Sequence, residues 1–297
     1  MSQFINSPIQ KKHFNNHTIY IKRDDLLSKD FSGNKARKFH YYLDHEFPHI
    51  KKIISYGSAQ SNAMYSISVL AKQRGWECEY YVTHIADYLK KNPQGNYKYA
   101  LENGMNIVEL KSENLEMSMT RLKPSFPSSV VVIEEGGRQS QAEYGLEILA
   151  QEIKAWQKEA EIEELNIFLP SGTGTTALFL QKHNKNSVYT TPCVGGVDYL
   201  KKQFLMLEKD ENLHPIILTP SKKRHFAKLY RESYNIWLEL QNKMGIEFDL
   251  LYDPHGWLTL LENPQIFEKP TLYIHQGGLI GNESMLARYQ RKYSENI

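Results

Sequence analysis

Short apolar runs alternate with helical patterns through most of the chain, and this alternation limits the fold most strongly. Runs with the length of buried strands occupy 53–57, 79–83, 106–110, 130–133 and 167–169. Helical patterns occupy 61–74, 97–102, 141–164 and 176–183. This spacing predicts an α/β fold of right-handed βαβ units around a mainly parallel sheet. Ligands bind beyond the carboxyl ends of such strands, so we expect the turns there to carry the chemistry.

Composition favours a globular protein without a nucleic-acid or membrane partner. The 297 residues suffice for one large domain or two smaller domains that share a cleft. The formal net charge of +2 gives no reason to expect a nucleic-acid or membrane partner. Residues 1–10 lack an apolar signal core, and no apolar run is long enough to span a bilayer. We therefore expect a cytoplasmic protein.

The cysteines do not indicate a special site. Cys78 and Cys193 are too few for a disulfide framework, and we expect both to be inert thiols in the core. No group of His, Cys, Asp and Glu residues has convincing metal-ligand spacing, so no metal is predicted.

Lys35 follows a Gly-Asn turn, Gly33-Asn34, close to the beginning of the chain. Such a turn can hold the backbone still while the lysine amine reaches into a pocket. Burial in a partly apolar pocket lowers the pKa of an amine, because it disfavours the charged form. A neutral amine can form a Schiff base with a carbonyl group. An ordinary solvated lysine is the alternative.

A glycine- and threonine-rich turn with the sequence PSGTGTT spans 170–176, between a predicted strand and a predicted helix. Its backbone N–H groups can converge on one point, and the start of the helix adds a positive dipole end, which suits a phosphate. The turn lacks the Gly-Lys-Ser/Thr of a nucleotide P-loop and the third glycine of a dinucleotide site. A tight turn with a threonine cap remains the alternative.

Two further turns carry candidate polar groups. In GSAQSN (57–62), Ser61 and Asn62 lie at a predicted helix N-terminus, which suits a carboxylate or a ring oxygen; simple helix capping is the alternative. In DLLYDP (249–254), Tyr252 beside Asp253 could be a general acid or base with a charge partner, or Asp253 could simply cap a turn. His275 ends an apolar strand, and we expect it to be structural.

These motifs, taken in order, resemble those of one enzyme family. The sequences KRDD (22–25), SGNKARK (32–38), QSN (60–62), DLLYD (249–253) and IHQGG (274–278) are similar to motifs of the 1-aminocyclopropane-1-carboxylate deaminase/D-cysteine desulfhydrase family. That family uses pyridoxal 5'-phosphate and has the tryptophan synthase β-like fold, fold type II, with two domains and mostly parallel open sheets. The matches run from about Ile21 to Gly278, nearly the whole chain.

The resemblance implies a role for each matching residue on the cofactor side. Lys35 would form the Schiff base with the cofactor, Asn62 would bond the ring hydroxyl, and Asp253 would face the pyridine nitrogen. An opposite charge there favours the protonated ring, which is the stronger electron sink. The phosphate would be held by Lys38 and by the turn residues Gly172, Thr173, Gly174, Thr175 and Thr176.

On the substrate side, the resemblance implies that Ser61 meets the substrate carboxylate and that Tyr252 is an acid, a base or an assistant to a nucleophile. Gln60 and Gln276 would also line this side. It further implies a larger domain of residues 1–41 and 138–297, a smaller domain of residues 42–137, the cofactor between them, and a homodimer.

The activity implied is that of a lyase or deaminase that acts on a small amino acid and releases ammonia and a 2-oxo acid. The acidic Asp253 favours deaminase-type chemistry, with D-cysteine desulfhydrase-like β-elimination as the alternative. Leu250, Pro254, His255 and Gln276 depart from the family pattern, as does Ser32 before the lysine motif. Two hypotheses from different classes therefore stay open: a cofactor-binding protein without catalysis, and a plain nucleotide or sugar-phosphate binder.

Overall fold

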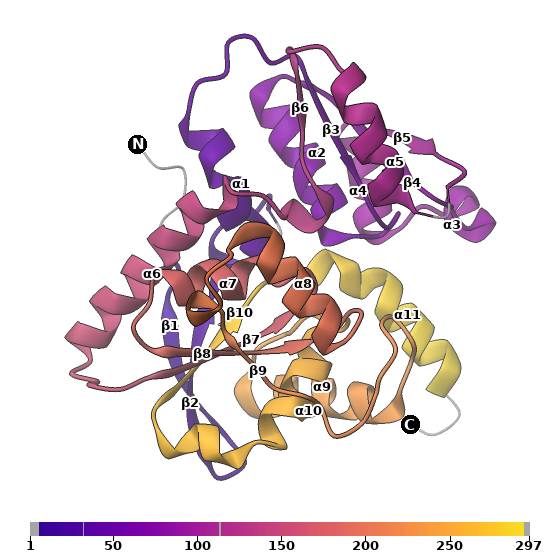
Figure 1. The fold of residues 1–297 in the computed structure, drawn as a ribbon. Coiled ribbons are helices and arrows are strands. Elements are labelled where there is room, and N and C mark those ends of the chain that lie inside the picture. The colour runs from indigo at the N-terminus through magenta and orange to yellow at the C-terminus, as the bar shows by residue number, and fades with distance from the viewer. Residues whose placement is uncertain (1–5, 32, 113, 294–297) are drawn as a thin grey trace.

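The molecule contains two β-sheets, and helices pack on both faces of each sheet. The computed structural model describes residues 6–31, 33–112 and 114–293, so Ser32 lies outside the described residues. A larger sheet uses both ends of this part of the chain, and a smaller sheet is formed by the segment between them (Figure 1). The α/β class and the mainly parallel sheets predicted from the sequence are confirmed. In the described ranges, no helix combines the length and the apolarity needed to cross a membrane.

The larger sheet has the strand order β1-β2-β10-β7-β8-β9. Its strands are β1 (Ile9–Phe14), β2 (His17–Arg23), β7 (Asn166–Ser171), β8 (Ser187–Pro192), β9 (Ile216–Ile217) and β10 (Thr271–His275). All neighbours are parallel except β1 and β2, which form an antiparallel hairpin at the edge. The hairpin turns at Asn15, whose φ of 52° lies in the left-handed region that asparagine tolerates.

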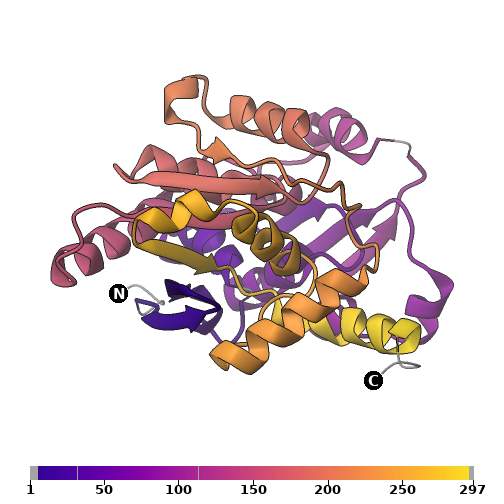
Figure 2. The ribbon, with the colours of Figure 1, turned by 90° about the horizontal axis from the view of Figure 1, so that it is seen from below.

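Helices cover both faces of the larger sheet because successive strand residues point to opposite sides. Ile167 and Leu169 of β7 pack with α6 (Ala142–Glu159) and α7 (Thr175–Lys182). Phe168 packs on the other face, against the helices α9 (Arg231–Met244), α10 (Asp253–Leu261) and α11 (Asn282–Tyr293). Figure 2 shows α9 and α11, in orange and yellow, on this second face. The helix α8 (Val197–Leu207) packs against α7.

The smaller sheet is entirely parallel, with the strand order β5-β4-β3-β6. Its strands are β3 (Lys52–Tyr56), β4 (Glu77–Val82), β5 (Asn106–Glu109) and β6 (Val130–Val132). The helices α2 (Asn62–Arg74) and α4 (Gly95–Glu102) pack on one face. The helix α5 (Leu115–Leu122) packs on the other, and α3 (Asp87–Lys91) follows β4.

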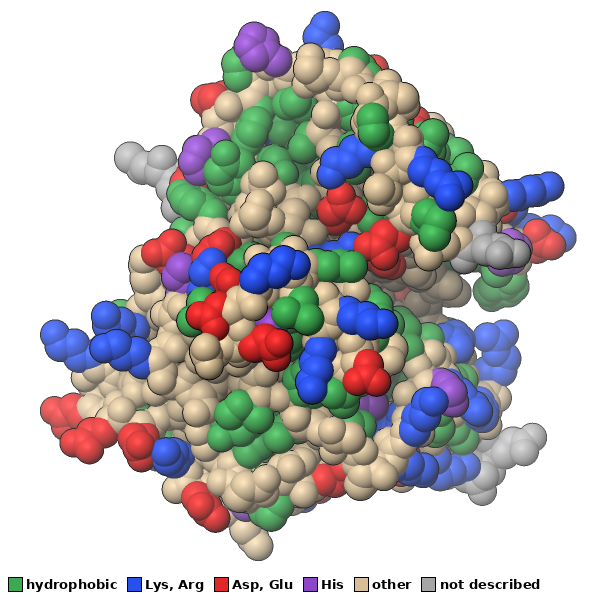
Figure 3. All heavy atoms as spheres, in the orientation of Figure 1, with side chains coloured by type: hydrophobic (Ala, Val, Ile, Leu, Met, Phe, Trp, Pro, Cys, Tyr) green, Lys and Arg blue, Asp and Glu red, His purple; other side chains and the backbone are tan. Residues whose placement is uncertain are grey.

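The helix α1 (Asn34–Asp44) connects the two parts of the molecule, because it packs against both α6 and α2. The domain boundary predicted before residue 42 falls within this helix. Short 3-10 helices complete the chain: η1 (Asp24–Leu26), η2 (Lys123–Ser125), η3 (Glu135–Gly137), η4 (Glu211–Leu213), η5 (Pro264–Glu268) and η6 (Leu279–Gly281). On the face drawn in Figure 3, basic and acidic side chains are interspersed across much of the surface.

A buried ion network fixes α1 to its surroundings. Arg37, only 1% exposed, donates to both carboxylate oxygens of Asp24 at 2.8 and 3.1 Å. Its guanidinium also donates to both oxygens of Glu152 on α6, each at 2.7 Å. Lys22 at the end of β2 adds a bond to Glu152, also at 2.7 Å. Burial opposes ionisation of Asp24. The charge and hydrogen bonds of Arg37, together with Lys22 and Ser7, outweigh it and hold the pKa of Asp24 below its usual value.

We expect Arg37→Ala to lower the free energy of unfolding by about 3–5 kcal/mol, because Asp24 would remain buried without its partner. The matched control is Lys243→Ala, which removes an exposed ion pair with Glu239. That pair should contribute less than about 0.5 kcal/mol. Urea denaturation of the three proteins measures both effects. Equal losses in the two variants would contradict the role of the network.

Candidate functional site

A cavity of about 390 Å³ lies between the helices of the smaller sheet and the turns that follow β7 and β10. This volume is in the range of pockets that hold small molecules. Every site residue predicted from the sequence lines this one cavity: Lys35, Lys38, Gln60, Ser61, Asn62, Gly172, Thr173, Gly174, Thr175, Thr176, Tyr252, Asp253 and Gln276.

The start of α1 is held against the end of β10 by a close backbone contact. The amide of Asn34 donates to the carbonyl of Gln276 at 2.9 Å. Gly33 precedes it with φ of +40°, and a Cβ built there would lie 2.0 Å from the same carbonyl oxygen. Only glycine allows this approach, since it has neither the Cβ nor its restriction on φ. The contact therefore fixes where the next residue, Lys35, enters the cavity.

The side chain of Gln276 strengthens the same contact. Its amide nitrogen donates to the carbonyl of Pro170 at 2.7 Å, and its amide oxygen accepts from the side chain of Asn34 at 2.8 Å. The family resemblance implies a place for Gln276 on the substrate side. Its carboxamide lines the cavity, but both ends are bonded within the protein, so it is better suited to hold Asn34 than to bind a ligand.

The amine of Lys35 has an environment that favours its neutral form. Burial lowers its pKa from 10.5 to about 8, although the charge of Asp249 acts in the opposite direction. Its Nζ donates to the side chain of Asn34 at 3.2 Å. At pH 7 a pKa near 8 leaves about a tenth of the amine neutral, far more than in a solvated lysine.

One end of the cavity is suited to an anion. Thr173 precedes the first turn of α7, and its hydroxyl lies 3.2 Å from that of Thr175. Lys38, only 4% exposed, points to this end and donates to the carbonyl of Gly136 at 3.0 Å. Within the described ranges no carboxylate pairs with Lys38. Burial and the nearby charges of Lys35 and Arg138 lower its pKa well below the usual value, and a bound anion would offset them.

Another part of the cavity wall contains two buried carboxyl groups. Asp253 accepts from the hydroxyl of Tyr273 at 2.6 Å and from the amide of Asp249 at 2.9 Å. Asp249 caps the next turn by accepting from the amides of Leu251 and Tyr252 at 2.8 and 2.6 Å. Burial raises the pKa of Asp249 to about 6 and that of Asp253 well above its usual value. A cation beside this pair would favour the ionised forms.

Ser61 both caps a helix and lines the cavity, the two roles that the sequence left open, and Asn62 lines the same cavity. Ser61 is the N-cap of α2, since its hydroxyl accepts from the amide of Met64 at 3.0 Å, and it also lines the cavity. The amide oxygen of Asn62 accepts from Asn96 at 2.7 Å. Asn96 was not identified from the sequence, because nothing in its local motif distinguishes it from a helix-start residue. It is 2% exposed, and its own amide oxygen has no partner in the described residues.

Tyr252 lies against the glycine- and threonine-rich turn at 170–176. A Cβ built on Gly172 would lie 3.3 Å from its ring, and the ring of Phe226 packs 5.1 Å away between centroids. Burial raises the pKa of its hydroxyl, so the group stays protonated at neutral pH and can donate a proton or a hydrogen bond. The changed residues after it, Pro254 and His255, lie in the first turn of α10, and Tyr252 lines the cavity.

The expectations for His275 and the cysteines are confirmed. His275 is fully buried, with Nε2 at 2.7 Å from the carbonyl of Glu247 and Nδ1 at 3.1 Å from the amide of Gly277. Cys78 and Cys193 are buried free thiols, and burial raises the pKa of each. None of the three is a candidate for catalysis.

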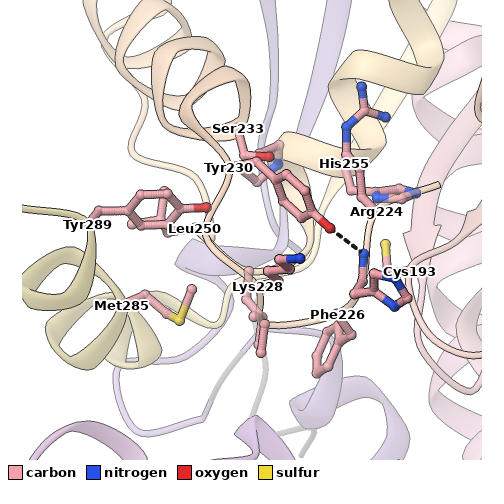
Figure 4. Close-up of a pocket in the computed structure, with 14 residues that line it drawn as sticks. Cys193, Arg224, Phe226, Lys228, Tyr230, Ser233, Leu250, His255, Met285 and Tyr289 are labelled. Atoms are coloured by element: carbon pink, nitrogen blue, oxygen red, sulfur yellow. Dashed lines mark hydrogen bonds between the residues drawn. The ribbon is translucent and has the colours of Figure 1, made fainter. Parts of the chain in front are cut away.

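A second cavity of about 20 Å³ lies beside the first, under residues 224–230 (Figure 4). The two cavities share Phe226, Ala227, Leu251 and Met285. The Nε2 atom of His255, on the wall of the small cavity, has no partner in the described residues. This volume is enough for one water molecule, which could bond that nitrogen.

We expect Gly33→Ala to destabilise the protein more than Gly75→Ala. Both glycines have positive φ, so each substitution should cost about 1–2 kcal/mol from backbone strain. A Cβ at Gly75 meets nothing within 4 Å, whereas at Gly33 it overlaps the carbonyl of Gln276. Urea denaturation should show a clear excess cost for Gly33→Ala, and equal costs would contradict the close contact.

We expect Lys35 in the ligand-free protein to titrate with a pKa near 8. The neutral amine reacts with acetic anhydride, so acetylation of Lys35 should rise with pH through about 8. Folding lowers this pKa, so between pH 8 and 10.5 Lys35 binds more protons in the unfolded chain than in the folded protein. The free energy of unfolding should therefore rise with pH over this range through the titration of Lys35. Peptide mass spectrometry measures the profile, with exposed Lys154 on α6 as the internal reference. A midpoint near 10.5 would contradict the desolvated site.

Comparisons with known proteins agree with this architecture. No family model matches the chain. A Thermotoga maritima protein with the name "Putative 1-aminocyclopropane-1-carboxylate deaminase" is 26% identical over 305 residues, which cover 94% of this chain and 93% of that protein. The crystal structure of an ACC deaminase homologue is similar with a TM-score of 0.80 and 21% identity, over 97% of this chain and 94% of the homologue.

A pyridoxal 5'-phosphate-dependent aspartate racemase is similar in structure with a TM-score of 0.62 and 12% identity, over 93% of this chain and 91% of that protein. At these identities the solved structures establish the fold alone. The chain therefore has the tryptophan synthase β-like fold, fold type II, and its resemblance to the 1-aminocyclopropane-1-carboxylate deaminase family is confirmed.

Proposed function

We propose that this protein is a pyridoxal-phosphate-dependent deaminase or lyase that converts a small amino acid to ammonia and a 2-oxo acid. The observation that carries the proposal is the position of Lys35. Its amine, with a pKa lowered to about 8, shares one cavity with two buried carboxyl groups and with Lys38, a buried lysine that pairs with no carboxylate in the described part of the chain.

The donor set fits this cofactor at each of its polar ends. Lys38 and residues 172–176 would hold the phosphate, which offsets the buried charge of Lys38. Asp253 would hold the proton on the ring nitrogen, and that positive charge offsets the burial of the acidic pair. Asn62 would donate its amide N–H to the ring hydroxyl, because its amide oxygen already accepts from Asn96.

When bound, the cofactor supplies an electron sink for the charge that develops at the α-carbon of the substrate. Lys35 would hold or move a proton at that carbon, since its amine titrates near neutral pH. Tyr252 would act as a proton donor, because its raised pKa keeps the hydroxyl protonated. Ser61 at the N-terminus of α2 would bind the substrate carboxylate, which the helix dipole favours.

The acidic residue at position 253 supports deaminase-type chemistry, because a carboxylate keeps the ring nitrogen protonated. A substrate such as 1-aminocyclopropane-1-carboxylate has no removable α-hydrogen, so its ring opening would depend on Tyr252 as proton donor. For a D-cysteine-like substrate, Lys35 would take the α-proton and sulfide would leave from the β-carbon.

The direct test is a product assay on protein loaded with pyridoxal phosphate. We expect 2-oxo acid and ammonia from at least one small amino acid, and Lys35→Ala should lower the rate by at least about 10³-fold because it loses the proton carrier. Lys154→Ala, an exposed lysine on α6, is the matched control and should leave the rate unchanged. Sulfide assays separate the desulfhydrase outcome. Failure to form product from any amino acid tested would favour a non-catalytic cofactor-binding protein.

A further inference from the structure

One carboxylate of the cavity remains after the cofactor-facing groups are assigned. Three acidic residues line the cavity, and two of them, Asp249 and Asp253, bond backbone amides and the hydroxyl of Tyr273. The third, Glu135, has a side chain that makes no hydrogen bond or ion pair with any residue that the structure describes. Its neighbour Glu134 accepts from Tyr56 at 2.6 Å and from Lys123 at 2.8 Å. Glu135 therefore is the acid with capacity for a ligand.

The backbone around Glu135 is fixed by the phosphate end of the site. Glu135 begins η3, and two residues separate it from the carboxyl end of β6. The carbonyl of Gly136 accepts from Lys38 at 3.0 Å, and a Cβ on Gly136 would lie 3.1 Å from Thr173. The backbone beside Glu135 is thus tied to the phosphate end of the cavity through Lys38 and Thr173.

The carboxylate itself lies on the substrate side of the cavity. Its Oε1 would be 3.2 Å from a Cβ built on Gly57, which begins the turn that carries Ser61. Burial raises the pKa values of Tyr199 and Tyr252, two tyrosines that also line the cavity, and the negative charge of Glu135 adds to the rise at each. Glu135 is therefore close to groups that would surround the substrate.

No protein cation among the described residues pairs with Glu135. Arg138 is the nearest candidate by charge, but its guanidinium donates to Gln203 and to Glu116. Burial raises the pKa of Glu135, which reflects a carboxyl group that water solvates poorly and that has no partner. A partly desolvated carboxylate gains most from a donor that enters with the ligand. The charged groups of the cofactor are already matched elsewhere, so this donor belongs to the substrate.

We propose that Glu135 binds a hydrogen-bond donor on the substrate side chain, so that this site prefers small amino acids with an amine or a hydroxyl on the β-carbon. This inference rests on the proposed function and specifies its substrate class. An amine should bind best, since it adds an opposite charge to the hydrogen bond. The apolar ring of 1-aminocyclopropane-1-carboxylate would leave Glu135 without a partner.

The test uses three amino acids of nearly equal size: 2,3-diaminopropionate, serine and alanine, in both enantiomers. Dissociation constants come from the stopped-flow change in absorbance of the cofactor-loaded protein before turnover. Wild-type protein should bind the amine most tightly, then the hydroxyl, then alanine. Glu135→Gln should weaken binding of 2,3-diaminopropionate about 10- to 100-fold and leave alanine unchanged. Equal affinities across the series in wild-type protein would overturn the proposal without any variant.

Glu134→Gln is the matched control, because it makes the same change one residue away on a side chain engaged with Tyr56 and Lys123. It should keep the wild-type order of affinities. Loss of the preference in both variants would overturn the assignment to Glu135. Cofactor absorbance shows whether the proposed function or only the role of Glu135 has failed. If pyridoxal phosphate binds but the amine gains nothing over alanine, only this inference fails; if no cofactor binds, the proposed function fails with it.

Discussion

The contact between the start of α1 and the end of β10 is the constraint on which the rest of the site depends. The missing side chain of Gly33 allows the amide of Asn34 to reach the carbonyl of Gln276 at 2.9 Å. Because Lys35 and Lys38 are three residues apart, one helical face carries both amines into the cavity once this end is fixed. Arg37, on another face of α1, anchors the helix to α6 through Glu152. The sequence of one short helix thus sets both the reactive amine and the phosphate-side cation.

The cavity contains buried ionisable groups of both signs that lack an oppositely charged partner among the described residues, and a ligand could supply these partners. Lys38 is buried without a carboxylate among the described residues, while Asp249 and Asp253 are buried without a directly paired cation there. Each arrangement is costly in the ligand-free protein, since burial disfavours the charged form of every one of these groups. A ligand with an anionic end and a basic ring nitrogen would relieve both costs. Glu135 then provides a third charge that the cofactor does not use.

The sequence predicted much of this arrangement because the relevant signals are local. Strand and helix alternation indicated parallel sheets. Four of the five family-like motifs, together with the turn at 170–176, identified residues that line one cavity. The edge hairpin β1–β2 was missed because its charged and polar residues hide the strand pattern. Asn96 and Glu135 were missed because their environments arise only when α2, α4 and η3 meet. The bonds that occupy Gln276 come from segments more than one hundred residues away, so no local pattern could predict them.

The central claim is that the fold delivers one particular lysine, Lys35, to a bound cofactor. The most direct measurement is to load the protein with pyridoxal phosphate, reduce it with borohydride, digest it and locate the attached cofactor by mass spectrometry. The account predicts the added mass on the peptide that contains Lys35, with Lys38 in the same segment unmodified. Attachment at Lys38 or another lysine, or no attachment at all, would contradict it.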